Sequence, residues 1–257
     1  MDNKEICWNI TARCNQACKY CHRFLYPQDL TFEENRIILN NLIDSGINAI
    51  TWTGGEALLV ERIDELLKIS FENGIKNKII TNGKLLTNDM IDKIYPYLDS
   101  ITLSIDSIDN DINFELGRGY NHYNEIKNVL DYITNQKYNI KLRINSVVCK
   151  NNLNSFKDLN NFLNRYNVYS WRIFKFMPLR ENAVKNKDKF DVSTSEYNDI
   201  INYIKNNSNI KNIDTRIQSD MEQKYVLILA NGDIVITSDG KDNKVGNALY
   251  DSIRKLV

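Results

Sequence analysis

The sequence has no excess of charge, no long apolar run and no linker of low complexity. Lys plus Arg number 33 among 257 residues, and Asp plus Glu also number 33. Such a balance gives the chain no overall field to attract nucleic acid or an anionic membrane. The first residues, Met1–Glu5, lack the basic and apolar pattern of a signal peptide, and no apolar run approaches a membrane span. We therefore expect a cytoplasmic protein that binds neither nucleic acid nor a membrane.

Cysteine is scarce, and its distribution excludes several kinds of site. The chain has five cysteines, an odd number, and none follows Cys149. A disulfide framework is therefore not expected, and further metal clusters in the last third of the chain would have no thiolates. We interpret Cys7 and Cys149, which lie on apolar strands, as small buried residues.

The other three cysteines, Cys14, Cys18 and Cys21, lie in one short loop. Thiolates at this spacing select an iron–sulfur cluster or zinc. Structural zinc usually takes two pairs of ligands, and because no second pair exists here the spacing favours an iron–sulfur cluster. A zinc site with His22 or a distant residue as its fourth ligand stays open as an alternative. Three thiolates would leave one iron of a [4Fe–4S] cluster free to bind a small molecule.

Six strand-like segments alternate with helical ones and predict an α/β fold with a parallel sheet. A capping box at Thr31–Glu34 begins the first helix. In the fifth strand Leu142 and Ile144 alternate with Arg143 and Asn145, so one face is apolar and the other polar. This pattern favours a partial (β/α)6 barrel with a ligand inside over an open sheet covered on both faces, although Arg143 could also lie on an exposed edge strand. The expected strands are Ile6–Ile10, Ala49–Thr53, Lys78–Thr81, Ser100–Ser104, Ile140–Val148 and Trp171–Phe176.

We expect one structural domain, in which residues 1–180 form the barrel core and residues 181–257 form an extension packed on it. The extension should contain a short helix, Ser193–Asn206. The segments Tyr225–Leu229 and Asp233–Thr237 flank Ala-Asn-Gly-Asp, which predicts a β-hairpin that closes the barrel mouth. We expect the protein to be a monomer.

Polar motifs follow several of the predicted strands, at the edge where such folds place catalytic groups. Gly54, Gly55 and Glu56 follow the second strand, and glycines there allow the backbone to approach a ligand closely. The motifs Thr81-Asn82-Gly83 and Ser104-Ile105-Asp106 lie after the third and fourth strands. A Gly-Gly-Glu motif alone is weak evidence for a ligand site. Its position one βα unit beyond the three cysteines makes it strong evidence.

The cysteine loop followed by Gly-Gly-Glu resembles the radical S-adenosylmethionine (SAM) superfamily, and the order of motifs matches over nearly the whole chain. The resemblance implies that Cys14, Cys18 and Cys21 hold a [4Fe–4S] cluster, whose free iron binds SAM. A donor such as flavodoxin or ferredoxin would supply the electron that cleaves SAM to methionine and a 5′-deoxyadenosyl radical. The residues implied to contact SAM or its surroundings are Tyr20, Gly54, Gly55, Glu56, Asn82, Ser104, Asp106 and Arg118.

The second half of the chain is similar to the viperin-like nucleotide dehydratases, a family of antiviral enzymes. Four stretches carry this resemblance in order: Leu116–Gly119, Arg143–Val148, Trp171–Phe174 and Asp220–Leu229. The resemblance implies dehydration of a nucleoside triphosphate to its 3′-deoxy-3′,4′-didehydro form, through removal of the ribose C4′ hydrogen. Tyr225 would supply a proton, and Arg143, Asn145, Arg172 and Lys175 would bind the nucleotide. For Tyr225 the alternative is a core aromatic residue, and for Arg172 and Lys175 a surface charge.

The sequence departs from this family at two places. Ser170 stands where the family commonly has a basic residue, for which Lys175 or Arg180 could compensate, and the segment after the hairpin is short. Two alternatives therefore stay open: another single-cluster radical enzyme, such as a glycyl-radical-activating or small-molecule-modifying enzyme, and a non-catalytic metal-binding module.

Overall fold

The computed structural model describes residues 4–25, 28–221, 226–238 and 241–251. A ten-stranded sheet runs through it in the order β10-β9-β8-β1-β2-β3-β4-β5-β6-β7. The strands from β1 to β7 pair in parallel, as expected for strands joined by helical crossovers. Their bounds are β1 (Glu5–Thr11), β2 (Ala49–Gly54), β3 (Lys76–Thr81), β4 (Ser100–Ser104), β5 (Lys141–Val148), β6 (Ser170–Lys175) and β7 (Ile213–Arg216).

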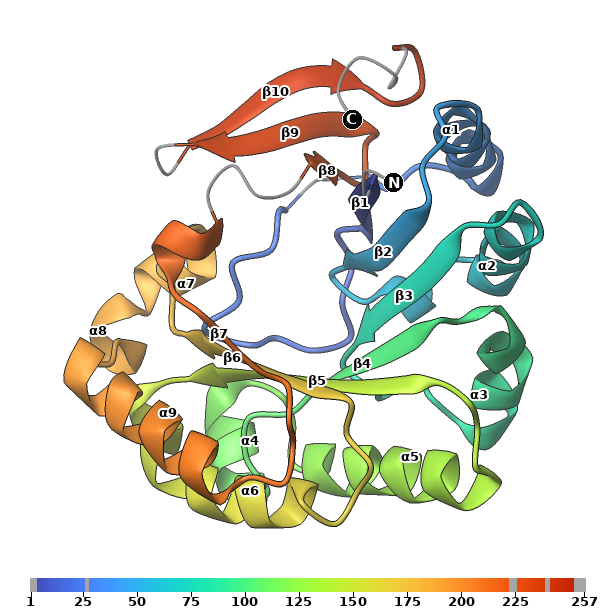
Figure 1. Ribbon diagram of the computed structural model, residues 1–257. Coiled ribbons are helices and arrows are strands. Elements are labelled where there is room, and N and C mark those ends of the chain that lie inside the picture. The colour runs from blue at the N-terminus through green and yellow to red at the C-terminus, as the bar shows by residue number, and fades with distance from the viewer. Residues whose placement is uncertain (1–3, 26–27, 222–225, 239–240, 252–257) are drawn as a thin grey trace.

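The sheet curves around a central space, and the helices cover its outer side (Figure 1). The two ends of the sheet, β10 and β7, do not pair with each other in the described structure, so the barrel is partial, as predicted. The helices are α1 (Phe32–Asp44), α2 (Ile63–Glu72), α3 (Asn88–Ile94), α4 (Asn110–Leu116), α5 (His122–Gln136), α6 (Phe156–Leu163), α7 (Glu181–Lys185), α8 (Lys187–Phe190) and α9 (Thr194–Asn207). Within the described ranges, none of them is long and apolar enough to cross a membrane.

The sequence pattern explains why the strands face as they do. Along β5 the burial alternates, with Leu142 and Ile144 in the core while Arg143 and Asn145 face the central space. The helix-facing side of the sheet contains the largest buried residues, including Trp8 and Trp52, whose stacked rings lie 5.0 Å apart. The helices also begin where local chemistry predicts, since Thr31 and Glu34 form the expected capping box at α1.

The C-terminal hairpin is confirmed, because β8 (Val226–Ile228) pairs antiparallel with β9 (Asp233–Ser238). It lengthens the sheet, because β8 also pairs in parallel with β1 and β9 pairs with a further strand, β10 (Lys241–Asn247). Neither β7 nor β10 was predicted. Both are half-buried or exposed along their length and lack the alternation that marks a strand in a sequence.

Candidate active site

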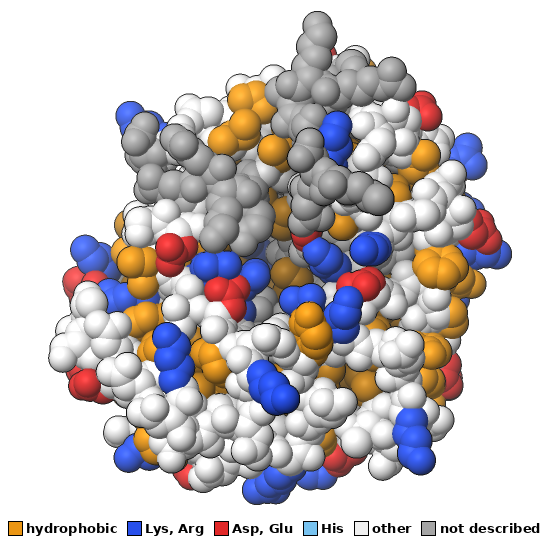
Figure 2. Space-filling view, in the orientation of Figure 1, with side chains coloured by type: hydrophobic (Ala, Val, Ile, Leu, Met, Phe, Trp, Pro, Cys, Tyr) orange, Lys and Arg blue, Asp and Glu red, His pale blue; other side chains and the backbone are white. Residues whose placement is uncertain are grey.

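The polar face of the sheet encloses a cavity of about 890 Å³. Its wall comprises side chains of β1–β6, the loop with the three cysteines, and residues from the C-terminal strands. Figure 2 shows the molecule hollowed in the centre of this view, with lysine and arginine side chains gathered around the hollow. Eight basic residues and three acidic residues line the cavity, so its lining carries an excess of positive charge although the chain as a whole does not.

The pairing register arranges the cavity wall in rows, each made by residues that lie side by side on adjacent strands. The upper row, at the end near the cysteine loop, contains Ser104, Asn145, Arg172 and Asp214. The middle row contains Ile80, Thr102, Arg143 and Ser170. The lower row contains Cys7, Thr51, Lys78 and Ser100. Successive rows are about 7 Å apart along a strand, since a strand rises about 3.3 Å per residue.

The three loop cysteines, Cys14, Cys18 and Cys21, are all partly exposed, free of disulfides and in the cavity lining. The Cys14 sulfur lies 3.4 Å from the backbone nitrogen of Gln16 and 3.7 Å from Nδ2 of Asn82. Three soft ligands in one loop, with nitrogen donors aimed at one sulfur, suit a cluster held by thiolates. This donor set fits the [4Fe–4S] cluster that the sequence predicts.

Gly54 and Gly55 are required by the approach of the cysteine loop to the end of β2. A Cβ atom on Gly55 would lie 2.0 Å from the carbonyl oxygen of Arg13, and one on Gly54 would lie 2.3 Å from that of Thr11. The backbone nitrogen of Gly55 donates to Thr11 O at 2.7 Å, and that of Glu56 donates to Arg13 O at 2.8 Å. The glycines therefore fix the start of the cysteine loop against β2, in addition to any contact with a ligand.

Glu56 is buried at the cavity wall, where it joins the ends of β2 and β3. Its carboxylate accepts from Thr81 Oγ1 at 2.7 Å, from the backbone nitrogen of Asn82 at 2.7 Å and from that of Leu58 at 3.2 Å. Burial raises the pKa of this carboxyl, against the lowering effect of these three donors. A positively charged amine that entered the cavity beside Glu56 would favour its ionised form.

Asp106, Arg118 and Tyr20 form a buried cluster beside the cysteine loop. Asp106 accepts from the guanidinium of Arg118, from the hydroxyl of Tyr20 and from the backbone nitrogen of Val147 at 2.7 Å. Arg118 and Tyr20 line the cavity, whereas Asp106 is fully buried and reaches it only through these two partners. The structure thus places Asp106 to hold Arg118 and Tyr20; whether it also contacts SAM stays a prediction.

Sequence reasoning missed a hydrogen-bond chain that links the cysteine loop to β4. His122 is fully buried, and its Nε2 lies 2.9 Å from the carbonyl oxygen of Ser104, which can only accept. Its Nδ1 must then accept from the side-chain amide of Gln16, 3.2 Å away. This choice turns Gln16 Oε1 toward Arg118, whose NH1 lies 3.2 Å from it. Gln16 lies between Cys14 and Cys18, so these hydrogen bonds fix the middle of the cysteine loop.

The structure places the four residues predicted to bind the nucleotide on two adjacent strands, β5 and β6, and all four line the cavity. Arg172 pairs with Asp214 at 2.6 Å, and Lys175 lies 3.7 Å from Asp191. Arg143 lies over the ring of Tyr169 at 4.9 Å, and its Nε is buried without an acceptor. Among the described residues no carboxylate forms an ion pair with Arg143.

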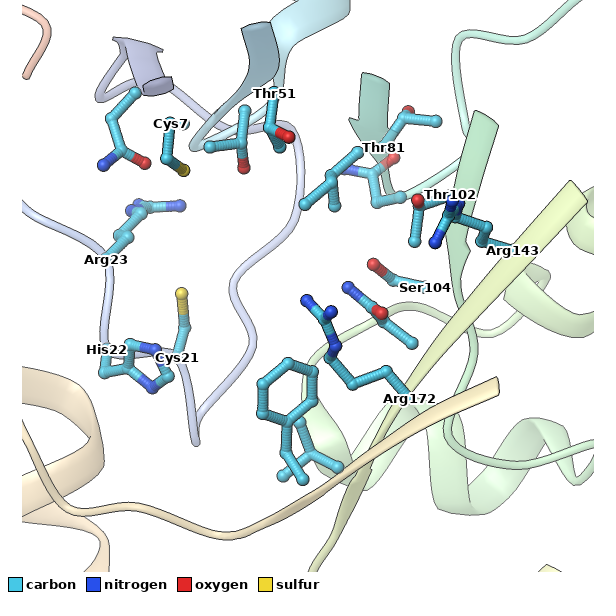
Figure 3. Close-up of a pocket in the computed structure, with 18 of the residues that line it drawn as sticks. Cys7, Cys21, His22, Arg23, Thr51, Thr81, Thr102, Ser104, Arg143 and Arg172 are labelled. Atoms are coloured by element: carbon cyan, nitrogen blue, oxygen red, sulfur yellow. The ribbon is translucent and has the colours of Figure 1, made fainter. Parts of the chain in front are cut away.

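Figure 3 shows Cys21, Ser104 and Arg172 pointing from three different elements into one open space. Cys7 also faces this space and lines the cavity, so its interpretation as a buried apolar residue is wrong. On β1 Glu5, Cys7 and Asn9 face the cavity, and the alternate positions Ile6, Trp8 and Ile10 face the core. Cys149 is fully buried, as predicted, and Tyr225 lies outside the described residues.

Comparison with known proteins decides the family. The model of the Radical SAM superfamily matches residues 8–163. The chain belongs to this superfamily. A protein of Flammeovirga pacifica named S-adenosylmethionine-dependent nucleotide dehydratase is 33% identical over 260 residues, which cover 95% of this chain and 83% of that protein. A protein of Oncorhynchus mykiss named S-adenosylmethionine-dependent nucleotide dehydratase RSAD2 is 25% identical over 235 residues, which cover 86% of this chain and 66% of that protein.

Solved structures share the fold of this radical SAM enzyme. Streptococcus suis SuiB, crystallised with SAM, superimposes with a TM-score of 0.76 at 19% identity, over 98% of this chain and 65% of that chain. The cofactors of the superfamily, a [4Fe–4S] cluster and SAM, are therefore the cofactors of this enzyme. When bound together and reduced, they supply a 5′-deoxyadenosyl radical. The residues that would hold them are the three loop cysteines and the polar groups around Glu56 and Arg118.

Proposed function

We propose that this radical SAM enzyme removes water from a nucleoside triphosphate and forms the 3′-deoxy-3′,4′-didehydro nucleotide. The observation that supports this most directly is Arg143, which faces the cavity with a buried, unpartnered Nε and without a carboxylate partner in the described structure. A half-buried guanidinium with a buried, unpaired Nε is suited to an anionic ligand, and arginine binds phosphate through two parallel hydrogen bonds. The names of the two nucleotide dehydratases cited above agree with such a substrate.

The reaction balances with one hydrogen atom and one hydroxyl group removed. The ribose C4′ loses its hydrogen atom to the 5′-deoxyadenosyl radical, and the 3′-hydroxyl leaves with a proton as water. One electron then completes the new double bond. We propose that Tyr225 supplies the proton and that a donor such as flavodoxin or ferredoxin supplies the electrons.

Residues of the upper and middle rows would share the binding of the nucleotide. Arg143 and Arg172 would bind phosphate groups, and Asn145, which lies beside Ser104 and Arg172 in the upper row, would hydrogen-bond the nucleotide. Asp214 forms a 2.6 Å ion pair with Arg172 and partly neutralises its guanidinium. In this arrangement the ribose would lie near the cysteine loop, where the radical is formed.

The proposal also covers the oligomeric state and the cellular location of the enzyme. We propose a monomer in the cytoplasm, where thiols stay reduced and a flavodoxin or ferredoxin is present. An antiviral role would follow from the modified nucleotide.

An anaerobic turnover assay tests this function. The reconstituted enzyme, with reductant and SAM, receives each of the four common ribonucleoside triphosphates in turn, and mass spectrometry follows 5′-deoxyadenosine and a nucleotide lighter by one water. We expect both products together with at least one nucleotide. Formation of 5′-deoxyadenosine at equal rates with every nucleotide and with none would contradict the proposed substrate and favour another single-cluster radical enzyme.

A further inference from the structure

An ion pair without an assigned role lies at the end of the cavity farthest from the cysteine loop. The Lys78 Nζ lies 2.7 Å from Glu5 Oε2, and the other oxygen of Glu5 accepts from Thr51 Oγ1 at 2.7 Å. All three residues line the cavity. The side chains of Lys78 and Glu5 are 24% and 28% exposed, so the pair is partly open to the cavity contents.

The position of Lys78 extends a series of basic residues along the cavity. Arg172 belongs to the upper row, Arg143 to the middle row and Lys78 to the lower row, as the strand pairing shows. Each step away from the cysteine loop is two residues, or about 7 Å along a strand, and because the three residues lie on β6, β5 and β3, Lys78 also lies two strands, about 10 Å, to the side of Arg143. A chain of phosphate groups that starts beside Arg172 and Arg143 and runs across β4 toward β3 would approach the long side chain of Lys78 with its terminal group.

Two polar atoms near this end have no partner in the described structure. Ser100 lies opposite Lys78 in the pairing of β3 and β4. Its hydroxyl is fully buried and makes no hydrogen bond. The Nε of Arg143, one row away, is also buried without an acceptor. Buried polar groups are almost always hydrogen-bonded in folded proteins, so an unpaired hydroxyl and an unpaired guanidinium nitrogen on one wall indicate a ligand with acceptor oxygens.

Glu5 holds Lys78 in position and weakens anion binding at this end of the cavity. Its carboxylate faces the same cavity and would repel an anion, while Thr51 and Lys78 hold it in place. A phosphate that reaches Lys78 compensates for this repulsion with a charge-assisted hydrogen bond. A shorter phosphate chain that stops in the middle row gains nothing from Lys78, because Lys78 remains paired with Glu5.

We propose that Lys78, positioned by Glu5, binds the terminal phosphate of the substrate and selects a nucleoside triphosphate over the diphosphate. This inference rests on the proposed function, since it assumes that the phosphates extend away from the cysteine loop. Lys78 is then a specificity-determining residue, and Glu5 is a positioning residue that acts through it.

Binding measurements without turnover test this inference. The anaerobic holoenzyme with SAM and without reductant is titrated calorimetrically with the 5′-triphosphates and 5′-diphosphates of cytidine, uridine, adenosine and guanosine. For the nucleoside that binds best, Lys78→Met should lower the affinity ratio of triphosphate to diphosphate about tenfold, the effect of losing one charge-assisted hydrogen bond. Glu5→Gln should raise triphosphate affinity several-fold.

A matched control lies on the same strand. Lys76 is exposed, lies two residues before Lys78 and is absent from the cavity lining, so Lys76→Met should leave the affinity ratio unchanged. If Lys78→Met does not fold, Glu5→Gln still decides, because unchanged triphosphate affinity there contradicts the role of the pair.

The outcomes separate this inference from the proposed function. The inference is overturned if Lys78→Met keeps the full preference for triphosphate, or if it loses affinity for triphosphate and diphosphate equally. Dehydration of a nucleotide by the native enzyme would still uphold the proposed function in that case. A native holoenzyme that binds and dehydrates none of the four nucleotides overturns both.

Discussion

The Nδ1 of His122 and the side-chain amide nitrogen of Gln16 lie 3.2 Å apart, and this contact joins the first turn of α5 to the middle of the cysteine loop. The ring is neutral, because burial lowers the pKa of His122 from its ordinary value of 6.5 to about 3. A protonated ring could no longer accept from Gln16.

Because its pKa is lowered on folding, His122 makes stability depend on pH. Between pH 6.5 and 3 the unfolded chain binds a proton at His122 that the folded chain does not bind, so the free energy of unfolding falls as the pH falls through this window. From pH 7.5 to 5 the loss from this residue is about 2 kcal/mol. Urea unfolding of the cofactor-free protein at both pH values measures it.

The variant His122→Phe isolates this contribution. It keeps a ring of similar shape, but leaves Gln16 and the Ser104 carbonyl without their partner, so the free energy of unfolding at pH 7.5 should fall by about 1–3 kcal/mol. Its pH dependence should be weaker than that of the native protein, although His22, whose pKa burial also lowers, to about 4, still contributes in both. Identical pH dependence in the two proteins would contradict a neutral buried His122.

Gly55→Ala should damage the cluster site. The added Cβ would meet the Arg13 carbonyl at 2.0 Å, so the cysteine loop must move away from β2, at a cost of about 1–3 kcal/mol or more. We expect lower iron content after reconstitution. Gly74→Ala serves as the control, because nothing lies within 4 Å of its Cβ and only its positive φ of 78° strains the chain. Equal iron content in both variants would show that the close approach is not needed.

Cys18→Ala should remove the cluster and, with it, SAM cleavage. Iron and sulfide analysis and the brown colour of the anaerobic protein report the cluster directly. Cys149→Ala is the matched control, because this thiol is fully buried outside the loop and its loss should lower stability by about 1 kcal/mol and leave the iron content unchanged. SAM cleavage that survives in Cys18→Ala would remove the loop from the mechanism.

Arg172→Ala and Asp214→Asn should shift nucleotide binding in opposite directions. The first removes a cation of the upper row, and the second frees the same guanidinium from its 2.6 Å ion pair. We expect roughly tenfold weaker binding in Arg172→Ala and somewhat tighter binding in Asp214→Asn, by calorimetry at one ionic strength. Weakened binding in both would mean that Asp214 mainly holds Arg172 in place.

Local patterns in the sequence were sufficient for the partial barrel and the position of the cysteine loop. Alternation along β5 distinguished Arg143 and Asn145 from the core residues Leu142 and Ile144, and the three cysteines are neighbours in the chain. The side chain of a strand residue alternates strictly between two faces, and a loop ligand set needs only short spacing, so both signals are local. The four-residue strand β7 gave no such signal because all its residues are half-buried.

Only the tertiary structure decided which distant residues meet. Gln16 and His122 are 106 positions apart, and Glu5 and Lys78 are 73 apart, so no spacing in the chain joins them. The sequence contains only two histidines, but the partner of His122 depends on how α5 packs beside β4. Strand register likewise set Lys78 beside Ser100 and made Cys7 a cavity residue, because register depends on pairing between strands that are far apart in the chain.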